Sequence, residues 1–185
     1  MNENAKKHPF APVFDGDSKV LILGSFPSPN SIEAGFYYGD SSNRFWNILG
    51  ALFGDTDIKK KSTADKIAFL KSRNIALWDI WGYCYKNPQD SSNDNDILPE
   101  PESQKVDLDE ILRTAKIQKI FTTIGTGDDE HPFNKWGIRE WIGGYFENID
   151  EILCPLCSTS GATRYSVNDL IEKYGYNQIK ETLEQ

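Results

Sequence analysis

The sequence predicts an α/β fold, in which a central four-stranded parallel sheet forms the middle layer of a three-layer αβα domain. Four short apolar runs are typical of buried strands, and segments with helical periodicity separate them along the chain. Strands that alternate with helices form parallel sheets with right-handed crossovers. The 185 residues suit one domain, which we expect to span residues 1–185.

The first predicted strand covers residues 19–23, where the apolar run KVLIL meets Gly24. A loop rich in Gly, Pro, Ser and Asn follows over residues 24–39, and Asn43 then opens a helix. The apolar residues of that helix recur at helical spacing, at Phe45, Ile48, Leu49, Leu52 and Phe53. The later elements continue the alternation: a helix over 63–72, a strand over 75–80, a loop over 87–106, a helix over 108–115, a strand over 119–124, a helix over 133–142, a strand beginning at 151–154, a loop over 155–164 and a helix over 167–183.

The loops that follow the strands are where we expect the functional site. Ligands of open parallel sheets bind beyond the carboxyl ends of the strands, so these loops should meet at one edge. Residues 87–106 lack periodicity, and a loop of that length in a compact domain is often functional.

The net charge of −8 and the pI of about 4.8 count against nucleic acid as a partner, because phosphate contacts usually require a basic surface. Much of the acidity falls in residues 89–110 and 128–130, so a face built elsewhere can be near neutral or locally basic. No apolar run approaches the ~20 residues that span a bilayer, and residues 1–12 carry no apolar signal core. We therefore expect a cytoplasmic protein without membrane contact.

The cysteines predict neither a disulfide framework nor a metal centre. Their number is three, which is odd, and a zinc or iron–sulfur site would need a fourth ligand beyond Cys84, Cys154 and Cys157. We expect Cys154 and Cys157 to be reduced and mostly buried.

The loop after the first strand carries the richest set of functional groups. Gly24 lets the backbone approach a ligand closely, Ser25 and Ser28 offer hydroxyls, and the aromatic residues 36–38 can stack on a planar ligand. The patterns of dinucleotide-binding and P-loops are missing.

Several polar residues have both a structural and a functional interpretation. Asn43 is a favoured helix cap, and composition alone puts that interpretation first. Arg44 suits a solvated surface position or a structural ion pair as well as a DNA contact. Asp79 ends the second strand, where it can activate water or cap the strand, and His8 can fold back over the sheet edge. The hydroxyl run at 158–160 suits a phosphate-binding turn and ordinary capping about equally.

The string GSFPSPNSIEAGFYYGDSSNRFW, residues 24–46, resembles the first motif of the uracil-DNA glycosylase superfamily, and most closely its hypoxanthine-DNA glycosylase branch. His8-Pro9-Phe10, the segment 76–79 and Asp90-Ser91-Ser92 also resemble that branch. The late loop over residues 155–162 resembles the second motif, which enters the duplex.

The resemblance implies a monofunctional enzyme that needs no metal and no other cofactor. In the branch that the sequence resembles, the catalytic Asn lies in the Asn-Arg-Phe-Trp element, and the resemblance therefore implies that Asn43 is the catalytic residue. In other branches an Asn or Asp of the first turn is catalytic, and Phe26 stands at that position here. The expected base pocket is Gly24, Phe26, Tyr38 and Asp79. The expected DNA contacts are Ser25, Pro27, Ser28, Arg44, Ser158, Thr159, Ser160 and Arg164.

We therefore expect a monomeric DNA glycosylase whose partner is DNA containing a damaged base. Hypoxanthine is the first expectation for that base, and uracil or xanthine the next. A base in a duplex must be flipped out before its glycosidic bond can be reached. Two alternatives stay open, a non-catalytic nucleic-acid-binding module on the same fold and a hydrolase of free nucleosides, which the acidic charge favours.

Overall fold

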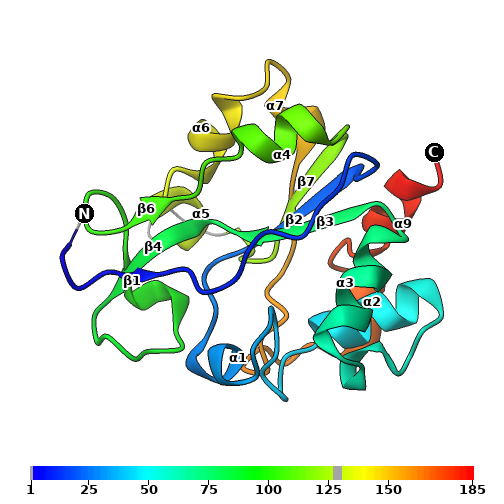
Figure 1. The fold of residues 1–185 in the computed structure, drawn as a ribbon, viewed down its shortest axis with the longest axis horizontal. Helices are drawn as coiled ribbons and strands as arrows, with labels where there is room; N and C mark the ends of the chain where they lie inside the picture. The colour runs from blue at the N-terminus through cyan, green and yellow to red at the C-terminus, as the bar shows by residue number, and fades with distance from the viewer. Residues whose placement is uncertain (1, 127–130) are drawn as a thin grey trace.

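A computed structural model describes residues 2–126 and 131–185 and contains the predicted parallel sheet (Figure 1). The sheet has the strand order β3-β2-β7-β8, and every pairing in it is parallel. Its strands are β2 (Val20–Gly24), β3 (Ile75–Asp79), β7 (Lys119–Thr122) and β8 (Leu153–Pro155). In this register Gly24 lies opposite Asp79, so two residues predicted to form the base pocket end neighbouring strands.

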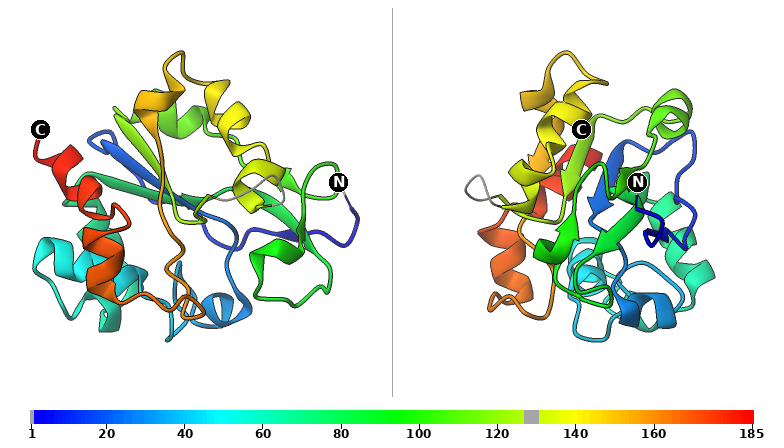
Figure 2. Two further views of the ribbon diagram at one scale, coloured as in Figure 1. Left: turned by 180° about the vertical axis from the view of Figure 1, so that it is seen from behind. Right: turned by 90° about the vertical axis from the view of Figure 1, so that its left-hand side faces the viewer.

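The sheet is buried on both faces, which is why its strands are apolar without alternation. Val20 and Ile22 of β2 belong to one core cluster, whereas Leu21 and Leu23 belong to the other. The first cluster is covered by α2 (Phe45–Phe53), α3 (Thr63–Lys71), α8 (Val167–Glu172) and α9 (Asn177–Leu183). The second is covered by α4 (Asp109–Thr114), α5 (Pro132–Lys135), α6 (Ile138–Gly143) and α7 (Ile149–Ile152). The predicted three-layer fold is thus confirmed, and Figure 2 shows the two helical groups on opposite sides of the sheet.

A small antiparallel sheet beside the parallel one was not predicted. Its central strand β4 (Trp81–Lys86) follows β3 after one residue and pairs with β1 (Lys6–Lys7), β5 (Ile97–Leu98) and β6 (Gln104–Lys105). The prediction of one continuous loop over 87–106 is therefore wrong, because this segment holds β5, β6 and the 3₁₀ turn η2 (Asp94–Asp96). Strands of two residues are too short to give a periodic signal.

Smaller corrections concern helix boundaries. The helix predicted over 133–142 is divided at Gly137, and the one over 167–183 at Gly175, where φ is +59° and +82°. Glu151 and Ile152 belong to α7, so the fourth strand begins at Leu153. The loop over 24–39 contains α1 (Pro29–Glu33), and a further turn, η1 (Ile58–Lys60), follows α2. Within the described ranges no helix has the length and apolarity to span a bilayer.

Candidate functional site

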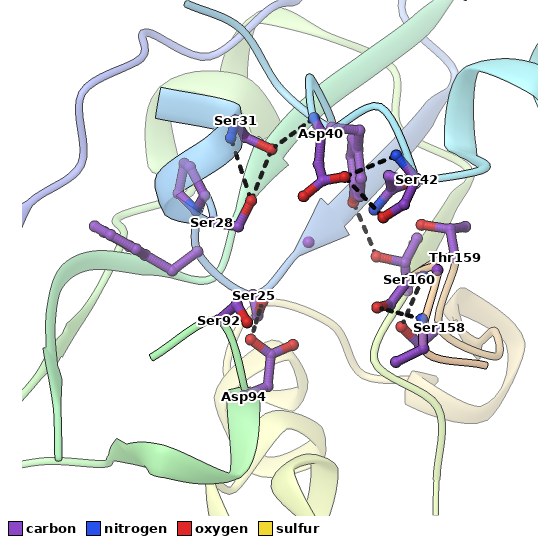
Figure 3. Close-up of a pocket in the computed structure, with 18 of the residues that line it drawn as sticks. Ser25, Ser28, Ser31, Asp40, Ser42, Ser92, Asp94, Ser158, Thr159 and Ser160 are labelled. Atoms are coloured by element: carbon purple, nitrogen blue, oxygen red, sulfur yellow. Dashed lines mark hydrogen bonds between the residues drawn. The ribbon is translucent and has the colours of Figure 1, made fainter. Parts of the chain in front are cut away.

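A cavity of about 280 Å³ opens beyond the carboxyl ends of the central strands, as expected for a parallel sheet (Figure 3). The loops after β2, β7 and β8 contribute to it, and β3 contributes its last residue, Asp79, so the strand ends meet at one edge as expected. Its lining includes these residues from the sequence prediction: Gly24, Ser25, Phe26, Pro27, Ser28, Tyr38, Asn43, Asp79, Ser158, Thr159 and Ser160. Arg44 and Arg164 lie outside the lining.

The sequence-based selection missed a further set of lining residues: Ser31, Asp40, Ser42, Ser92, Asp94, Thr123, Gly161 and Ala162. Thr123 directly follows β7, so the rule that ligands bind at the carboxyl ends of strands could have identified it. Ser92 and Asp94 reach the cavity because β4 folds the segment after it back over the sheet edge. Because β4 was not predicted, no sequence pattern placed these two residues at the cavity, although Asp90-Ser91-Ser92 resembled the glycosylase branch.

Gly24 ends β2 at the floor of the cavity, and its lack of a side chain is a steric requirement. A Cβ at this position would lie 2.2 Å from Oδ1 of Asp79 and 2.6 Å from the hydroxyl oxygen of Tyr38. Both distances are far below van der Waals contact. Gly24 therefore allows a carboxylate and a phenol to approach each other at the floor.

Asp79 is held at that floor by His8, and its side chain is only 5% exposed. Nε2 of His8 lies 3.0 Å from Oδ2 of Asp79. The His8 ring packs against Phe10, Phe26 and Tyr37, with centroid distances of 5.5–5.9 Å. The expectation that His8 folds back over the sheet edge is thus confirmed, and it gives Asp79 one fixed orientation.

Tyr38 lines the cavity. Its ring stacks on Phe45 with a centroid distance of 3.9 Å, and its backbone takes φ of +52°, which is rare for a residue with a side chain. Its hydroxyl is hydrogen-bonded to Oγ1 of Thr123 at 2.8 Å. Burial raises the pKa of this hydroxyl well above its ordinary value, so it remains a neutral donor.

Asn43 is fixed at the cavity wall by three contacts. Its N–H donates to the carbonyl of Asp40, its carbonyl accepts from Nζ of Lys59 at 2.7 Å, and its Oδ1 accepts the N–H of Phe45 at 2.9 Å. The last contact joins the side chain to the first residue of α2, but the N-cap of that helix is Arg44, whose side chain makes no capping hydrogen bond, so the interpretation of Asn43 as the helix cap is wrong by one position. Nδ2 has no partner among the described residues.

The turn before Asn43 is organised by Asp40. One carboxylate oxygen accepts the N–H and the hydroxyl of Ser42, both at 2.7 Å, and the other accepts Nδ2 of Asn30. These hydrogen bonds, first those from Ser42 and then that from Asn30, lower the pKa of Asp40. The carboxylate thus orders the turn that presents Asn43.

Arg44 is committed to the late loop. Its guanidinium donates to Oγ1 and the carbonyl of Thr163 at 2.7 and 2.6 Å and to the carbonyl of Gly161, while its N–H donates to the carbonyl of Thr159. These partners are neutral, so the contact is a clamp between α2 and the late loop. Arg164 is exposed and is available to solvent.

Asp94 was not predicted, and it lies on the cavity wall opposite the turn of Asp40 and Ser42 (Figure 3). Its Oδ1 accepts the hydroxyl of Ser25 at 2.8 Å and lies 3.8 Å from Nζ of the buried Lys86. Burial raises the pKa of Asp94, an effect that Lys86 and Ser25 partly offset. Ser25, predicted as a DNA contact, therefore also fastens this wall to the first loop.

Within residues 2–126 and 131–185, no three His, Cys, Asp or Glu side chains come together in a way that could hold a metal ion. The cysteines are free thiols. Cys154 and Cys157 are half-buried rather than mostly buried, and burial raises the pKa of both.

Comparison with known proteins gives a consistent result. The family model of the Uracil DNA glycosylase superfamily matches residues 11–173. A hypoxanthine DNA glycosylase of Methanosarcina barkeri is 30% identical over 162 residues, which are 88% of this chain and 91% of the relative. One of Methanosarcina acetivorans is 37% identical over 75 residues, 40% of this chain and 47% of the relative. The solution NMR structure of a candidate uracil DNA glycosylase from M. acetivorans has a TM-score of 0.70 and 28% identity, with 97% of this chain and 99% of the other covered.

Proposed function

This chain belongs to the uracil DNA glycosylase superfamily and is a DNA glycosylase, and we propose that it excises hypoxanthine from deoxyinosine in DNA. On this proposal it acts as a monomer that flips the deaminated base into the cavity, with uracil as a poorer substrate. The excision opens base excision repair at the damaged site. Two relatives named as hypoxanthine DNA glycosylases support the choice of base.

The observation that carries the proposal is the cavity, where Asn43 and the hydroxyl-rich loops meet at the sheet edge. Its volume of about 280 Å³ lies near the lower end of the ~300–1,000 Å³ typical of ligand pockets. Tyr38 and Phe26 offer aromatic surface for a flipped base. The hydroxyls of Ser158 and Ser160 can donate to the phosphates that flank it, which fixes the strand without reading its sequence, whereas the hydroxyl of Ser28 donates to Ser31 and caps α1.

The proposed catalytic group is the carboxamide of Asn43. Glycosidic cleavage passes through an oxocarbenium-like sugar, and negative charge develops on the departing base. A donor already in place stabilises that charge without reorganisation. Because Oδ1 accepts from Phe45, Nδ2 is the atom suited to this role, and this favours contact with the leaving group over positioning of water.

The proposed enzyme is monofunctional, with water as the acceptor of the sugar. A bifunctional glycosylase forms a Schiff base and therefore needs an amine at the sugar. No lysine lies among the described residues of the cavity wall, and Lys59 donates to the carbonyls of Ser41 and Asn43 from behind the turn.

Replacing Asn43 tests the proposal. We expect Asn43→Ala and Asn43→Ser each to lower single-turnover excision of hypoxanthine by about 100- to 1,000-fold, the usual effect of removing one such donor. A serine hydroxyl can accept the N–H of Phe45 as Oδ1 of Asn43 does, so Asn43→Ser should keep the thermal stability of the wild type, whereas Asn43→Ala should lose about 1 kcal/mol. The assay is strand scission by hot alkali of duplexes containing deoxyinosine, uracil, xanthine or mismatched thymine.

Retention of wild-type excision by Asn43→Ser would remove Asn43 from the catalytic role. A folded wild type that cleaves none of these duplexes would contradict the proposed function. In that case hydrolysis of free inosine would indicate a nucleoside hydrolase, and duplex binding without excision would indicate a non-catalytic module.

A further inference from the structure

We infer that Asp79 recognises the ring N–H that deamination creates, and that this carboxylate separates hypoxanthine and uracil from their parents adenine and cytosine. The inference rests on the proposed function, because it assigns the base-reading group of the same cavity. It goes further by naming the edge of the base that is read and the atom that reads it.

The first argument is that Asp79 has one committed oxygen and one free oxygen. Oδ2 lies 3.0 Å from Nε2 of His8, whereas Oδ1 accepts no hydrogen bond from the described residues. Oδ1 lies against Gly24 at the cavity floor, and the side chain is 95% buried. A buried carboxylate is an acceptor only and is costly without a donor, so the floor is suited to a ligand that brings an N–H.

The second argument is the hydroxyl beside that oxygen. Oδ1 of Asp79 and the hydroxyl oxygen of Tyr38 both lie within 2.6 Å of the point that a Cβ on Gly24 would occupy. Tyr38 and Thr123 share one hydrogen bond, so one hydroxyl hydrogen serves the pair and the other remains to be donated. The floor therefore presents an acceptor and a donor side by side.

The chemistry of the bases complements this pair. Adenine has an acceptor at N1 and a donor at its amino group, and deamination reverses both, giving hypoxanthine with N1–H beside a carbonyl. Uracil acquires the same N–H and carbonyl pair when cytosine is deaminated. A carboxylate accepts from the new N–H but repels the lone pair on N1 of adenine. Guanine and thymine already carry this edge, so Asp79 discriminates only against adenine and cytosine.

His8 determines which atom of residue 79 faces the base. Since a carboxylate only accepts, Nε2 of His8 carries the hydrogen of their contact and holds Oδ2 away from the cavity. In Asp79→Asn the same N–H would hold the amide oxygen, which turns the amide NH₂ toward the base. This variant keeps the shape of the side chain and presents a donor where the wild type presents an acceptor.

The experiment compares wild type and Asp79→Asn on duplexes containing deoxyinosine or 1-methyldeoxyinosine. The methyl group removes N1–H and leaves the carbonyl in place. We expect the wild type to excise hypoxanthine about 100-fold faster than 1-methylhypoxanthine, the effect of losing a hydrogen bond to a charged group. Asp79→Asn should lose about 100-fold on hypoxanthine for the same reason, whereas a side chain that only filled space would tolerate this isosteric change.

The control is Asp40→Asn, which changes a carboxylate at the rim of the same cavity. Its effect on rate should fall equally on both substrates and leave their ratio unchanged. Wild-type excision of 1-methylhypoxanthine at the rate of hypoxanthine would overturn the inference, as would full activity of Asp79→Asn, and neither result would touch the proposed function. A wild type that excises uracil only would overturn the proposed base, and 3-methyluracil would then test Asp79 in the same way.

Discussion

The site depends on the absence of a side chain at Gly24. β2 and β3 are adjacent parallel strands, so their last residues, Gly24 and Asp79, lie opposite each other. With glycine on one strand, the carboxylate of the other can turn over it toward Tyr38. The floor of the cavity is therefore a product of strand register.

Gly24→Ala should abolish this arrangement. The added Cβ would meet Oδ1 of Asp79 at 2.2 Å, and neither Asp79 nor Tyr38 can swing away, because His8 and Thr123 hold them. We expect excision to fall by at least about 100-fold, since displacements near 1 Å have that effect, and the free energy of unfolding to fall by about 1–3 kcal/mol. Single-turnover rates and denaturant titrations measure the two quantities.

Gly143→Ala is the matched control. Gly143 ends α6, and a Cβ there would meet no heavy atom within 4 Å. This variant should keep wild-type excision and gain up to about 1 kcal/mol in the free energy of unfolding. Equal activity of the two variants would mean that the floor is not the base-binding surface.

Residue roles could be predicted from the sequence only where local chemistry decides them. The side chain of Asn43 contacts the N–H of Phe45, two positions away, and residue type alone suggested such a local contact, although the N-cap itself is Arg44. The clamp of Arg44 on Thr163 joins residues 119 positions apart, and the contact of His8 with Asp79 spans 71. Such pairs are created by the crossovers of the fold, so no local pattern could indicate that Arg44 would contact the late loop.

Among the elements, the late loop is the one whose order depends most on a single side chain. Residues 158–162 line the cavity, yet they belong to no helix or strand. Arg44 lies at the start of α2, and its guanidinium donates to two carbonyls and one hydroxyl of the loop. The two motifs of the site are thus fastened to each other through the start of α2.

Arg44→Ala should loosen the late loop without unfolding the sheet. We expect amide hydrogen exchange over residues 158–163 to accelerate and excision to fall by about 100-fold on every substrate alike. Arg44→Lys should not restore the loop, because one ammonium cannot reproduce the planar fork that reaches two groups at once.

Arg164→Ala is the comparison for that change, because it removes an exposed cation from the same loop. Exchange over residues 158–163 should stay at the wild-type rate in this variant. Unchanged exchange in Arg44→Ala would show that the loop is ordered without the clamp.

The prediction of elements succeeded where apolar runs were long and failed where a glycine or a short strand decided the structure. The elements β2, β3, β7 and α2 have the expected positions because most of their residues are apolar and buried. Gly137 and Gly175 take positive φ and divide helices that periodicity alone had joined. The two-residue strands β5 and β6 exist only through pairing with β4, which is tertiary structure.

At the scale of the whole molecule, the net charge of −8 has to be reconciled with DNA as the substrate. Two cations near the turn that presents Asn43 are already engaged, Lys59 with the carbonyls of Ser41 and Asn43 and Arg44 with the late loop. Burial lowers the pKa of Lys59. The groups left for phosphates are therefore hydroxyls, backbone N–H groups and Arg164.

This composition predicts an unusually shallow salt dependence of DNA binding. Only cations that neutralise phosphates release counterions, and each contributes about −0.9 to the slope of log K against log salt, whereas hydroxyl donors contribute nothing. We expect a slope of about −1 to −2, so affinity should fall only roughly tenfold between about 50 and 200 mM salt. Fluorescence anisotropy with a duplex carrying a non-cleavable deoxyinosine analogue measures it.

Two variants separate the contributions to that slope. Arg164→Ala should make the slope shallower by about 1, because it removes one phosphate-facing cation. Ser160→Ala should weaken binding at every salt concentration and leave the slope unchanged. A wild-type slope of about −6 or steeper would contradict a hydroxyl grip, since it requires at least six neutralised phosphates and hence a basic surface elsewhere on the molecule. Screening by salt also weakens the repulsion between the acidic chain and the duplex, which flattens the slope further and strengthens the contrast between the two outcomes.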